Sequence, residues 1–260
     1  ATLTPEQAAD DVDAWQVARG PSMARMMVAV CGAAWKWGRH PRRRLVAGPC
    51  PFTSADLDRA GGRTVIWSVA QAEAAVAANA RLGFHDVADA ITLMEWTGAA
   101  PVDLCAATLD QLAGPTWSYR RSKTGKTAIP GISAPARARL DRRASYDWTS
   151  AGAAPIHRLV LAHPQTGAAL SPVALRRRFN QALDQALRAA RAGQLPAATA
   201  QVLETIHSQG LRLPDLRDTC ITRLRGAGIS AARTAQWVGH TEAGCEELWQ
   251  KHYAIPLEQQ

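Results

Sequence analysis

The sequence predicts a mainly α-helical protein with a small antiparallel β-sheet, an α+β architecture. Several segments place apolar residues at three- and four-residue spacing, which is typical of amphipathic helices. Alanine, a strong helix former, recurs along the whole chain. Two short segments, 117–122 and 127–132, are joined by a Lys-Thr-Gly-Lys turn, which predicts a β-hairpin. The sequence contains no βαβ pattern, no GxGxxG motif and no Walker loop.

The first predicted helix covers 22–37, where apolar residues recur at helical spacing. This spacing predicts that Met23, Met26 and Trp37 are core residues rather than ligand contacts.

Prolines and glycines interrupt the helical pattern between residues 41 and 62. We therefore expect three parts, a small helical segment at 1–48, a linker at 49–62 and a main domain at 63–260.

The main domain is predicted to open with helices at 69–82 and 86–96. Gly98 is placed to end the second of these helices. Pro101 suits the first position of a helix, which we expect to extend to residue 112.

Ser171 and Pro172 predict the N-cap and first residue of a long helix. The remaining predicted elements are a helix at 133–146, a short strand at 158–162, and helices at 216–224, 231–238 and 242–252.

The composition is that of a globular protein, with 260 residues, 47% hydrophobic and 20% charged. No stretch is apolar and long enough for a membrane helix, and the acidic, polar first residues do not resemble a signal peptide. Five widely spaced cysteines without a CxxC pair argue against a disulfide framework and a structural zinc site. We therefore expect a cytoplasmic protein without a membrane partner.

Basic residues exceed acidic ones, 30 against 22, which gives a formal net charge of +8. They fall into four clusters, which comprise Lys36, Arg39, Arg42, Arg43 and Arg44, then Arg120, Arg121, Lys123 and Lys126, then Arg137, Arg139, Arg142 and Arg143, and finally Arg176, Arg177, Arg178, Arg188 and Arg191. Four clusters favour a surface that follows phosphate groups, with solvated helix faces as the alternative. The candidate DNA-binding residues are Arg42, Arg43, Arg44, Arg120, Arg121, Lys126, Arg176, Arg177 and Arg178.

Six short motifs occur in a characteristic order. They are Glu-Trp-Thr-Gly-Ala-Ala-Pro-Val-Asp-Leu at 95–104, Arg-Ser-Lys-Thr-Gly-Lys at 121–126, Pro-Asp-Leu-Arg-Asp-Thr at 214–219, Gly-Ala-Gly at 226–228, Val-Gly-His-Thr at 238–241 and Lys-His-Tyr-Ala at 251–254. In this order they resemble the catalytic domain of the tyrosine recombinase (phage integrase) family over about 63–260. Segment 1–48 resembles the end of that family's core-binding helical domain, without its earlier helices.

The resemblance implies DNA cleavage without a metal or any other cofactor. In this family a tyrosine attacks the scissile phosphate, forms a 3′-phosphotyrosyl link and releases a 5′-hydroxyl. The chemistry needs a nucleophile, a proton donor and cations around the phosphate. The implied partner is double-stranded DNA, with a homotetramer on DNA if the protein is active. The implied setting is recombination or integration by a mobile element of bacterial or phage origin.

The resemblance assigns the catalytic roles to four residues. Tyr253 matches the nucleophile, and Lys123 matches the hairpin lysine that protonates the leaving oxygen, with Lys126 as its rival. Arg217 matches an arginine whose planar fork suits a phosphate. His240 matches a histidine that hydrogen-bonds a phosphate oxygen. For each residue a structural role is the alternative.

Two positions depart from the family pattern, because Ala100 stands where the family has its first arginine and Pro214 where it has a histidine. Losing two preorganised donors costs on the order of 10⁴ in rate if their effects add. We therefore predict impaired or lost catalysis. The alternatives are a catalytically silent DNA-binding protein with a regulatory or architectural role, and a basic helical protein with a partner other than DNA.

Overall fold

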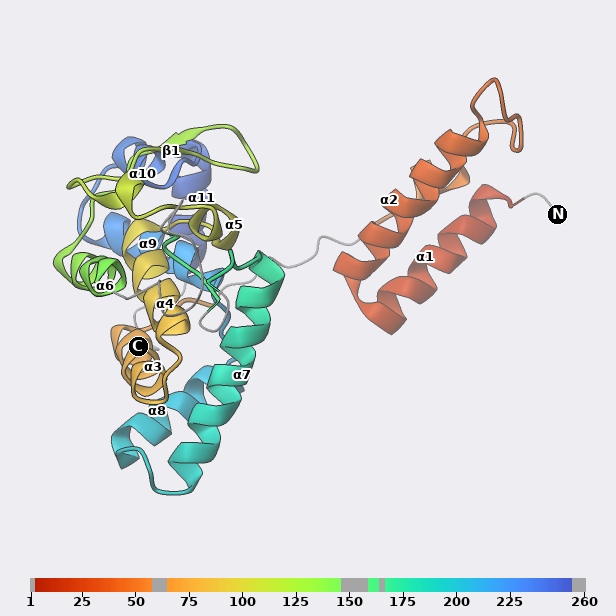
Figure 1. The fold of residues 1–260 in the computed structure, drawn as a ribbon. Coiled ribbons are helices and arrows are strands. Elements are labelled where there is room, and N and C mark those ends of the chain that lie inside the picture. Colours follow the sequence, from red (N-terminus) through yellow and green to blue (C-terminus); the bar gives the residue numbers. More distant parts are fainter. Residues whose placement is uncertain (1–2, 58–64, 146–158, 164–166, 254–260) are drawn as a thin grey trace. The chain divides into compact units, whose positions relative to one another are not determined.

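The computed structural model describes four stretches of the chain, with side chains up to Lys251 except that of Ser54. These stretches are 3–57, 65–145, 159–163 and 167–253. The chain separates into two compact units, Ala1–Arg63 and Thr64–Gln260 (Figure 1). Within the described stretches, no helix combines the length and the apolar character needed to cross a membrane.

Two helices form the N-terminal unit, α1 (Pro5–Arg19) and α2 (Pro21–Gly38). Thr4 begins α1 through a capping box with Gln7, in which each side chain bonds the other's backbone N–H. The sequence analysis did not identify α1, because this helix is acidic and carries only a narrow apolar face.

Part of the segment that we expected to be a linker, 49–62, is structured. Pro51–Ser54 form a 3₁₀ helix, η1, and Phe52 is buried in one cluster with Ala8 and Val12 of α1. The ring of Trp15 stacks on Phe52 with centroids 5.8 Å apart. The packed part of this unit therefore extends beyond residue 48.

The prediction that Met23, Met26 and Trp37 are core residues is wrong. Their exposed fractions are 40%, 55% and 55%. Helix α2 instead turns a neighbouring face toward α1, where Ala24 is fully buried. The helix carries two apolar stripes, and the described part of this unit supplies a neighbouring helix for only one of them.

The second unit is built around α4 (His85–Thr97), most of whose residues are buried. It lies at the centre of the unit, with helices on several sides (Figure 1). Gly98 ends α4 in the left-handed conformation, with φ of 64°, as predicted. The helices that pack against α4 are α3 (Val69–Arg81), α5 (Pro101–Cys105), α6 (Ala134–Ala144), α7 (Pro172–Arg191) and α9 (Asp215–Gly226).

The helix predicted from Pro101 to residue 112 ends early, at Cys105. Beyond α5 the carbonyl of Ala107 accepts a hydrogen bond from the N–H of Val160 at 3.0 Å, so it is not available to a helical donor. A separate 3₁₀ turn, η2 (Asp110–Leu112), follows.

The strand predicted at 158–162 is not found in its described part. Leu159 forms an isolated bridge with Thr108, and Ala162 forms another with Ala169. Residue 158 lies outside the described residues. A long helix, α8 (Ala197–Ser208), packs on α3 and α7 and was absent from the sequence analysis.

The predicted hairpin is present as two short antiparallel strands, β1 (Tyr119–Arg120) and β2 (Thr127–Ala128). Tyr119 pairs with Ala128, and Arg120 pairs with Thr127. The turn at 121–126 joins the strands, so it carries the lysines singled out in the sequence.

The C-terminal helices form a second, smaller core. They are α9, α10 (Ala231–Val238) and α11 (Glu242–Tyr253). Ile221, Val238 and Cys245 are fully buried between them. The hairpin joins this core through the N–H of Ile129, which donates to the carbonyl of Gln236 at 3.0 Å.

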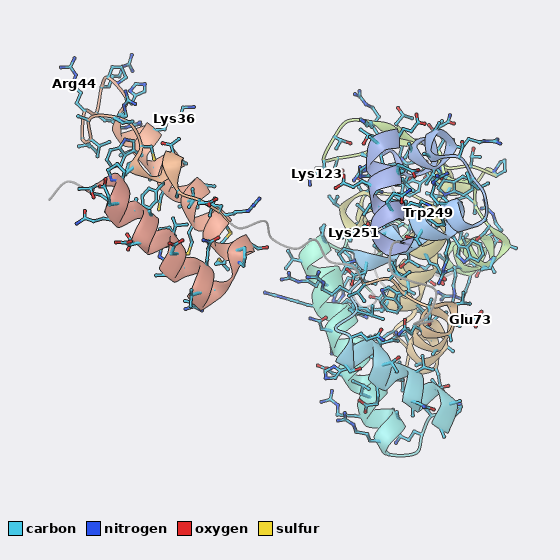
Figure 2. All side chains as sticks on the ribbon, turned by 180° about the vertical axis from the view of Figure 1, so that it is seen from behind. Lys36, Arg44, Glu73, Lys123, Trp249 and Lys251 are labelled. Atoms are coloured by element: carbon cyan, nitrogen blue, oxygen red, sulfur yellow. The ribbon has the colours of Figure 1, made fainter. Side chains whose placement is uncertain are left out.

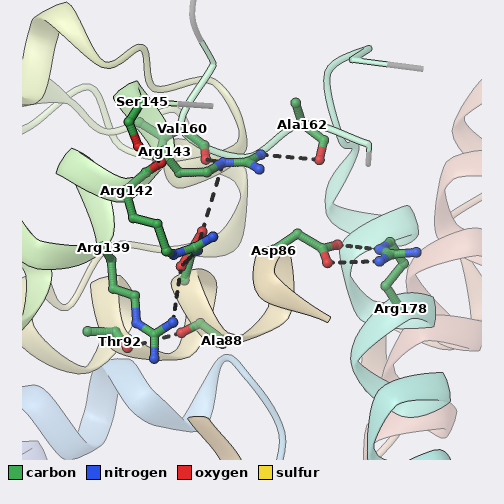
Figure 3. A network of polar contacts seen from close by, with 11 residues as sticks. Asp86, Ala88, Thr92, Arg139, Arg142, Arg143, Ser145, Val160, Ala162 and Arg178 are labelled. Atoms are coloured by element: carbon green, nitrogen blue, oxygen red, sulfur yellow. Dashed lines mark hydrogen bonds and ion pairs between the residues drawn. The ribbon is translucent and has the colours of Figure 1, made fainter. Parts of the chain in front are cut away.

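Two buried carboxylates on α4 neutralise arginines from the basic clusters (Figure 3). Asp89 lies 2.5 Å from Nη2 of Arg142 and within 4 Å of Arg139 and Arg143. Burial raises the pKa of Asp89, and the three guanidinium charges oppose that shift. The third basic cluster is therefore partly an internal ion-pair network that fixes α6 to α4.

Asp89→Asn is expected to reduce the free energy of unfolding by about 3 kcal/mol, because it leaves several guanidiniums beside a neutral group. The expected loss is at the low end of the range for breaking a buried ion pair, because the side chain of Arg142 is partly exposed. Urea unfolding followed by circular dichroism measures the change. Asp184→Asn on the exposed face of α7 is the control. Equal losses in the two variants would contradict the network's structural role.

Candidate functional site

The guanidinium of Arg217 is the centre of the candidate site. Its side chain extends from the first turn of α9 and is almost completely buried, with 9% of the residue exposed. Nη1 donates to the carbonyl of Gly98 at 2.5 Å, and Nη2 donates to the carbonyl of Val238 at 2.7 Å. These two carbonyls lie at the C-terminal ends of α4 and α10, where helices leave acceptors without partners. Arg217 thus joins three helix ends through its charge.

Arg121 enters the same region from the hairpin. Side chains alternate along a strand, so Trp117, Tyr119 and Arg121 share the inner face while Arg120 faces solvent. The Trp117 and Tyr119 rings stack with centroids 4.0 Å apart. Nη1 of Arg121 donates to the carbonyl of Gly239 at 2.9 Å, and only 10% of its side chain is exposed.

Gly239 is needed at this point for two reasons. Its φ of +63° is the left-handed conformation that ends α10. A Cβ atom there would also lie 2.6 Å from Cδ of Arg121 and 3.0 Å from Cβ of Ala128. The glycine therefore allows Arg121 to pass directly over the end of α10.

His240 follows this glycine and is oriented by its own backbone neighbour. The N–H of Thr241 donates to Nδ1 at 2.8 Å, so the neutral ring carries its proton on Nε2. Burial and the charge of Arg217 lower the pKa of His240, a hydrogen bond with the Thr241 backbone partly opposes this shift, and the charges of Arg121 and Lys126 add to it. The imidazole is thus kept neutral as an Nε2–H donor beside two arginines.

Lys123 and Lys126 lie in the exposed turn of the hairpin, and Lys123 projects outward (Figure 2). Asp103 holds the base of this turn, because its Oδ1 accepts hydrogen bonds from the backbone N–H of Ser122 at 2.8 Å and from its hydroxyl at 2.7 Å. The carboxylate is buried and belongs to α5. The turn that carries Lys123 is therefore anchored to the region that holds Arg217.

Tyr253 is the last residue of α11, and its side chain lies outside the described residues. A second tyrosine, Tyr119, lies close to Arg121 and Arg217. Burial raises the pKa of Tyr119 to about 12, which opposes formation of a phenolate there. Of these two tyrosines, Tyr253 is therefore the better candidate for a nucleophile.

The candidate DNA-binding residues of the N-terminal unit are exposed. Arg42, Arg43 and Arg44 occupy the turn after α2, where Figure 2 labels Arg44 and Lys36. The guanidinium of Arg43 lies 4.0 Å from the centre of the Trp37 ring, a cation–π geometry. This stacking gives the exposed Trp37 a packed neighbour.

The candidates of the second unit divide into two groups. Arg120, Arg176 and Arg177 are exposed. Arg178 is instead paired with the buried carboxylate of Asp86, with Nη2 at 2.8 Å from Oδ1 (Figure 3). Its charge is neutralised within the fold, which the sequence pattern of three consecutive arginines did not indicate.

Pro214, one of the two departures from the sequence pattern, lies in the wall of an open cavity of about 340 Å³. Pro101, which follows the other departure, Ala100, also lines this cavity. Arg176 and Arg212 also line it. The cavity therefore has a positively charged rim close to the two positions where donors are absent.

The sequence analysis named Arg217, His240 and Arg121, and the structure brings all three to the end of α10. The inward direction of the Arg121 side chain was not predicted, although the alternation of side chains along the strand from Trp117 indicates it. The sequence analysis also missed Asp103. Among the described residues, no group of three or more His, Cys, Asp or Glu side chains is arranged to hold a metal ion.

No family model matches the chain, and no curated protein matches it at a significant level. Solved structures are similar to it. A λ integrase dimer bound to a COC′ core site gives a TM-score of 0.69 at 12% identity, over 99% of this chain and 83% of that one. The Tn1549 transposon integrase in complex with a circular intermediate DNA gives 0.67 at 15%, over 95% and 81%. XerA recombinase gives 0.52 at 13%, over 95% and 78%.

These likenesses show the fold, a mainly helical unit with a small antiparallel sheet, as in tyrosine recombinase catalytic domains. The fold class predicted from the sequence is therefore confirmed.

Gly239→Ala is expected to lower the free energy of unfolding more than the same replacement at a glycine that has a positive φ but no close neighbours. Gly193→Ala, at a φ of +71° in open space, provides that control. The left-handed conformation costs about 1 kcal/mol in each variant, and the contact with Arg121 adds about 1–3 kcal/mol at residue 239. Thermal and urea unfolding measure both. Equal losses would show that Arg121 does not lie over Gly239.

Proposed function

We propose that the chain is a DNA-binding member of the tyrosine recombinase (phage integrase) family. It acts in site-specific recombination or integration through a 3′-phosphotyrosyl intermediate, with impaired catalysis. The observation that carries the proposal is the buried guanidinium of Arg217 beside the neutral His240, on this fold. The λ integrase and Tn1549 integrase structures contain DNA, which supports double-stranded DNA as the partner.

The chemistry of the site fits a phosphodiester. Arg217 supplies a fixed positive charge, and Nε2–H of His240 supplies a neutral donor that stays uncharged because the pKa of the ring is lowered. Tyr253 loses its phenolic proton to solvent and attacks the phosphorus, and Lys123 donates a proton to the leaving 5′-oxygen. The bond from phosphorus to the 5′-oxygen breaks as the bond to the tyrosine oxygen forms.

Ala100 and Pro214 explain why we propose impaired catalysis. Neither side chain donates a hydrogen bond, and each replaces a donor of the family pattern. Removing one preorganised donor typically costs about 10²–10³ in rate. Binding depends on other residues, because phosphate contacts from exposed arginines set position and affinity.

A catalytically silent DNA binder is the second candidate function. The specific observation in its favour is that Arg42, Arg43, Arg44, Arg176 and Arg177 are exposed and do not depend on the catalytic positions. Such a protein would retain duplex binding in a regulatory or architectural role. A homotetramer on DNA is expected only if the protein is an active recombinase. The λ integrase structures include a dimer and a tetramer.

Duplex binding is expected to weaken steeply with salt, with a slope in a log–log plot of about −0.9 for each phosphate neutralised. The double variant Arg176→Ala, Arg177→Ala is expected to reduce the slope by about 2 units at most. Fluorescence anisotropy with a labelled duplex measures the slope between about 50 and 300 mM salt. Over this range the Debye length falls from above about 10 Å to below about 8 Å, so the screening of phosphate contacts changes clearly. Arg188→Ala, at the other end of α7, is the control. A salt-independent affinity would favour a partner other than DNA.

A covalent adduct is expected to form slowly with nicked duplex DNA and to survive denaturation. Tyr253→Phe is expected to abolish it, because the nucleophilic oxygen is lost. Tyr119→Phe is the comparison and should reduce the adduct without abolishing it, since the buried hydroxyl of Tyr119, with a pKa raised to about 12, can donate a hydrogen bond but is not the nucleophile. Denaturing gels with labelled DNA detect the adduct. An adduct lost in Tyr119→Phe but kept in Tyr253→Phe would overturn the assignment of the nucleophile.

A further inference from the structure

Two arginines from different parts of the chain hold consecutive carbonyls at the end of α10. Arg217 donates to Val238 and Arg121 donates to Gly239, at 2.7 and 2.9 Å. The two guanidiniums therefore bind the same short turn. Burial lowers the pKa of Arg217, and the charge of Arg121 lowers it further, as expected for like charges held close together.

The described residues supply too little negative charge for this pair. The carboxylate of Asp103 lies 3.9 Å from Nε of Arg121, beyond hydrogen-bonding distance. Among the described residues, no carboxylate lies within 4 Å of the Arg217 guanidinium, whose hydrogen-bond partners are both backbone carbonyls. Buried charge is costly unless a counter-charge compensates it. The nearby negative charge comes from Asp103, 3.9 Å from Arg121, and from Asp218, whose charge partly opposes the lowering of the Arg217 pKa. The two guanidiniums are therefore only partly compensated and favour an anion.

Unpartnered polar atoms lie in the same region. The Tyr119 hydroxyl and Nε of Arg121 are buried donors without a hydrogen-bond partner among the described residues. Oδ2 of Asp103, a buried acceptor 3.9 Å from that Nε, has no hydrogen-bond partner there either. Buried polar groups are normally hydrogen-bonded. Both donors belong to residues on the inner face of the hairpin. An anion with several oxygen atoms, such as phosphate, has the acceptors that these donors lack.

The position of Ala100 connects this region to the departure from the family pattern. Ala100 lies two residues after Gly98, whose carbonyl binds Arg217. Its own carbonyl accepts the N–H of Asp103 at 3.0 Å, and Asp103 binds Ser122 beside Arg121. Residue 100 and Arg121 are thus placed near the same guanidinium, one from α5 and one from the hairpin.

We propose that Arg121 and Arg217 together bind one phosphate group, with the Tyr119 hydroxyl as a further donor, so that Arg121 supplies the cation absent at position 100. The proposal rests on the proposed function, because the phosphate is that of a DNA strand. Arg121 acts there as a phosphate-binding residue of the site. Asp103 is a positioning residue, since it touches the turn and orients Arg121.

The test uses inorganic phosphate as the probe and needs no DNA target. The side-chain Nε–H signals of the arginines are followed by NMR while phosphate replaces chloride at constant ionic strength. Arg121→Met keeps the aliphatic stem that packs on Gly239 and removes the charge. It is expected to weaken phosphate binding about 10- to 100-fold, the effect of one charge-assisted hydrogen bond. Arg233→Met, at an exposed position in the first turn of α10, is expected to change it less than about twofold.

A rescue variant separates phosphate binding from a purely structural role. Ala100→Arg combined with Arg121→Met is expected to recover at least about tenfold of the lost affinity, because it returns a guanidinium to the region. Arg121→Lys keeps the positive charge but loses the planar guanidinium, so its phosphate affinity is expected to lie between those of the wild type and Arg121→Met. If Arg121→Met fails to fold, Arg121→Lys serves as the test of phosphate binding.

Four results would overturn the proposal. They are undetectable phosphate binding by the wild-type protein, wild-type affinity in Arg121→Met, no recovery in the rescue variant while it remains folded, or wild-type affinity in Arg121→Lys. Failure of the proposed function has a different signature, because it appears as salt-independent duplex binding and leaves the phosphate result intact.

Discussion

The buried charge of Arg217 holds the site together, because its guanidinium satisfies carbonyls at the ends of both α4 and α10. Both helices end in left-handed glycines, Gly98 and Gly239, which expose those carbonyls to a donor from α9. His240 follows directly after the second glycine, so its position depends on the same contact. A residue that could serve a reaction is thus also part of the packing, and its removal is expected to affect both.

The many arginines of this chain occur in three distinct situations. On α4, Asp86 and Asp89 neutralise Arg178 and the arginines of α6, and these pairs fasten helices to each other (Figure 3). Arg176 and Arg177, next to Arg178, remain exposed. A third situation occurs at the end of α10, where two guanidiniums meet without an adequate counter-charge. Burial and partner, rather than sequence clustering, therefore decide what each arginine does.

Local sequence signals predicted much of the fold. Ser171, Gly98 and the hairpin turn mark real boundaries, because caps and turns depend on neighbouring residues. Tertiary contacts decided the rest. The helix from Pro101 stops where Ala107 bonds Val160, a residue distant in sequence. The apolar residues of α2 form two stripes, and the sequence did not show which of them packs against α1. For the site, spacing identified Arg217 and His240, but the role of Asp103 depends on a contact between α5 and the hairpin that no local pattern encodes.

The central claim is that two guanidiniums, from α9 and from the hairpin, hold one phosphate. The most direct measurement is the anomalous scattering of tungstate, a tetrahedral phosphate analogue, soaked into crystals of the protein. We expect one strong peak, with the oxygen atoms of the bound tungstate about 2.7–3.2 Å from nitrogen atoms of both Arg121 and Arg217. Tungstate bound at other sites, with no peak between these two side chains, would contradict it.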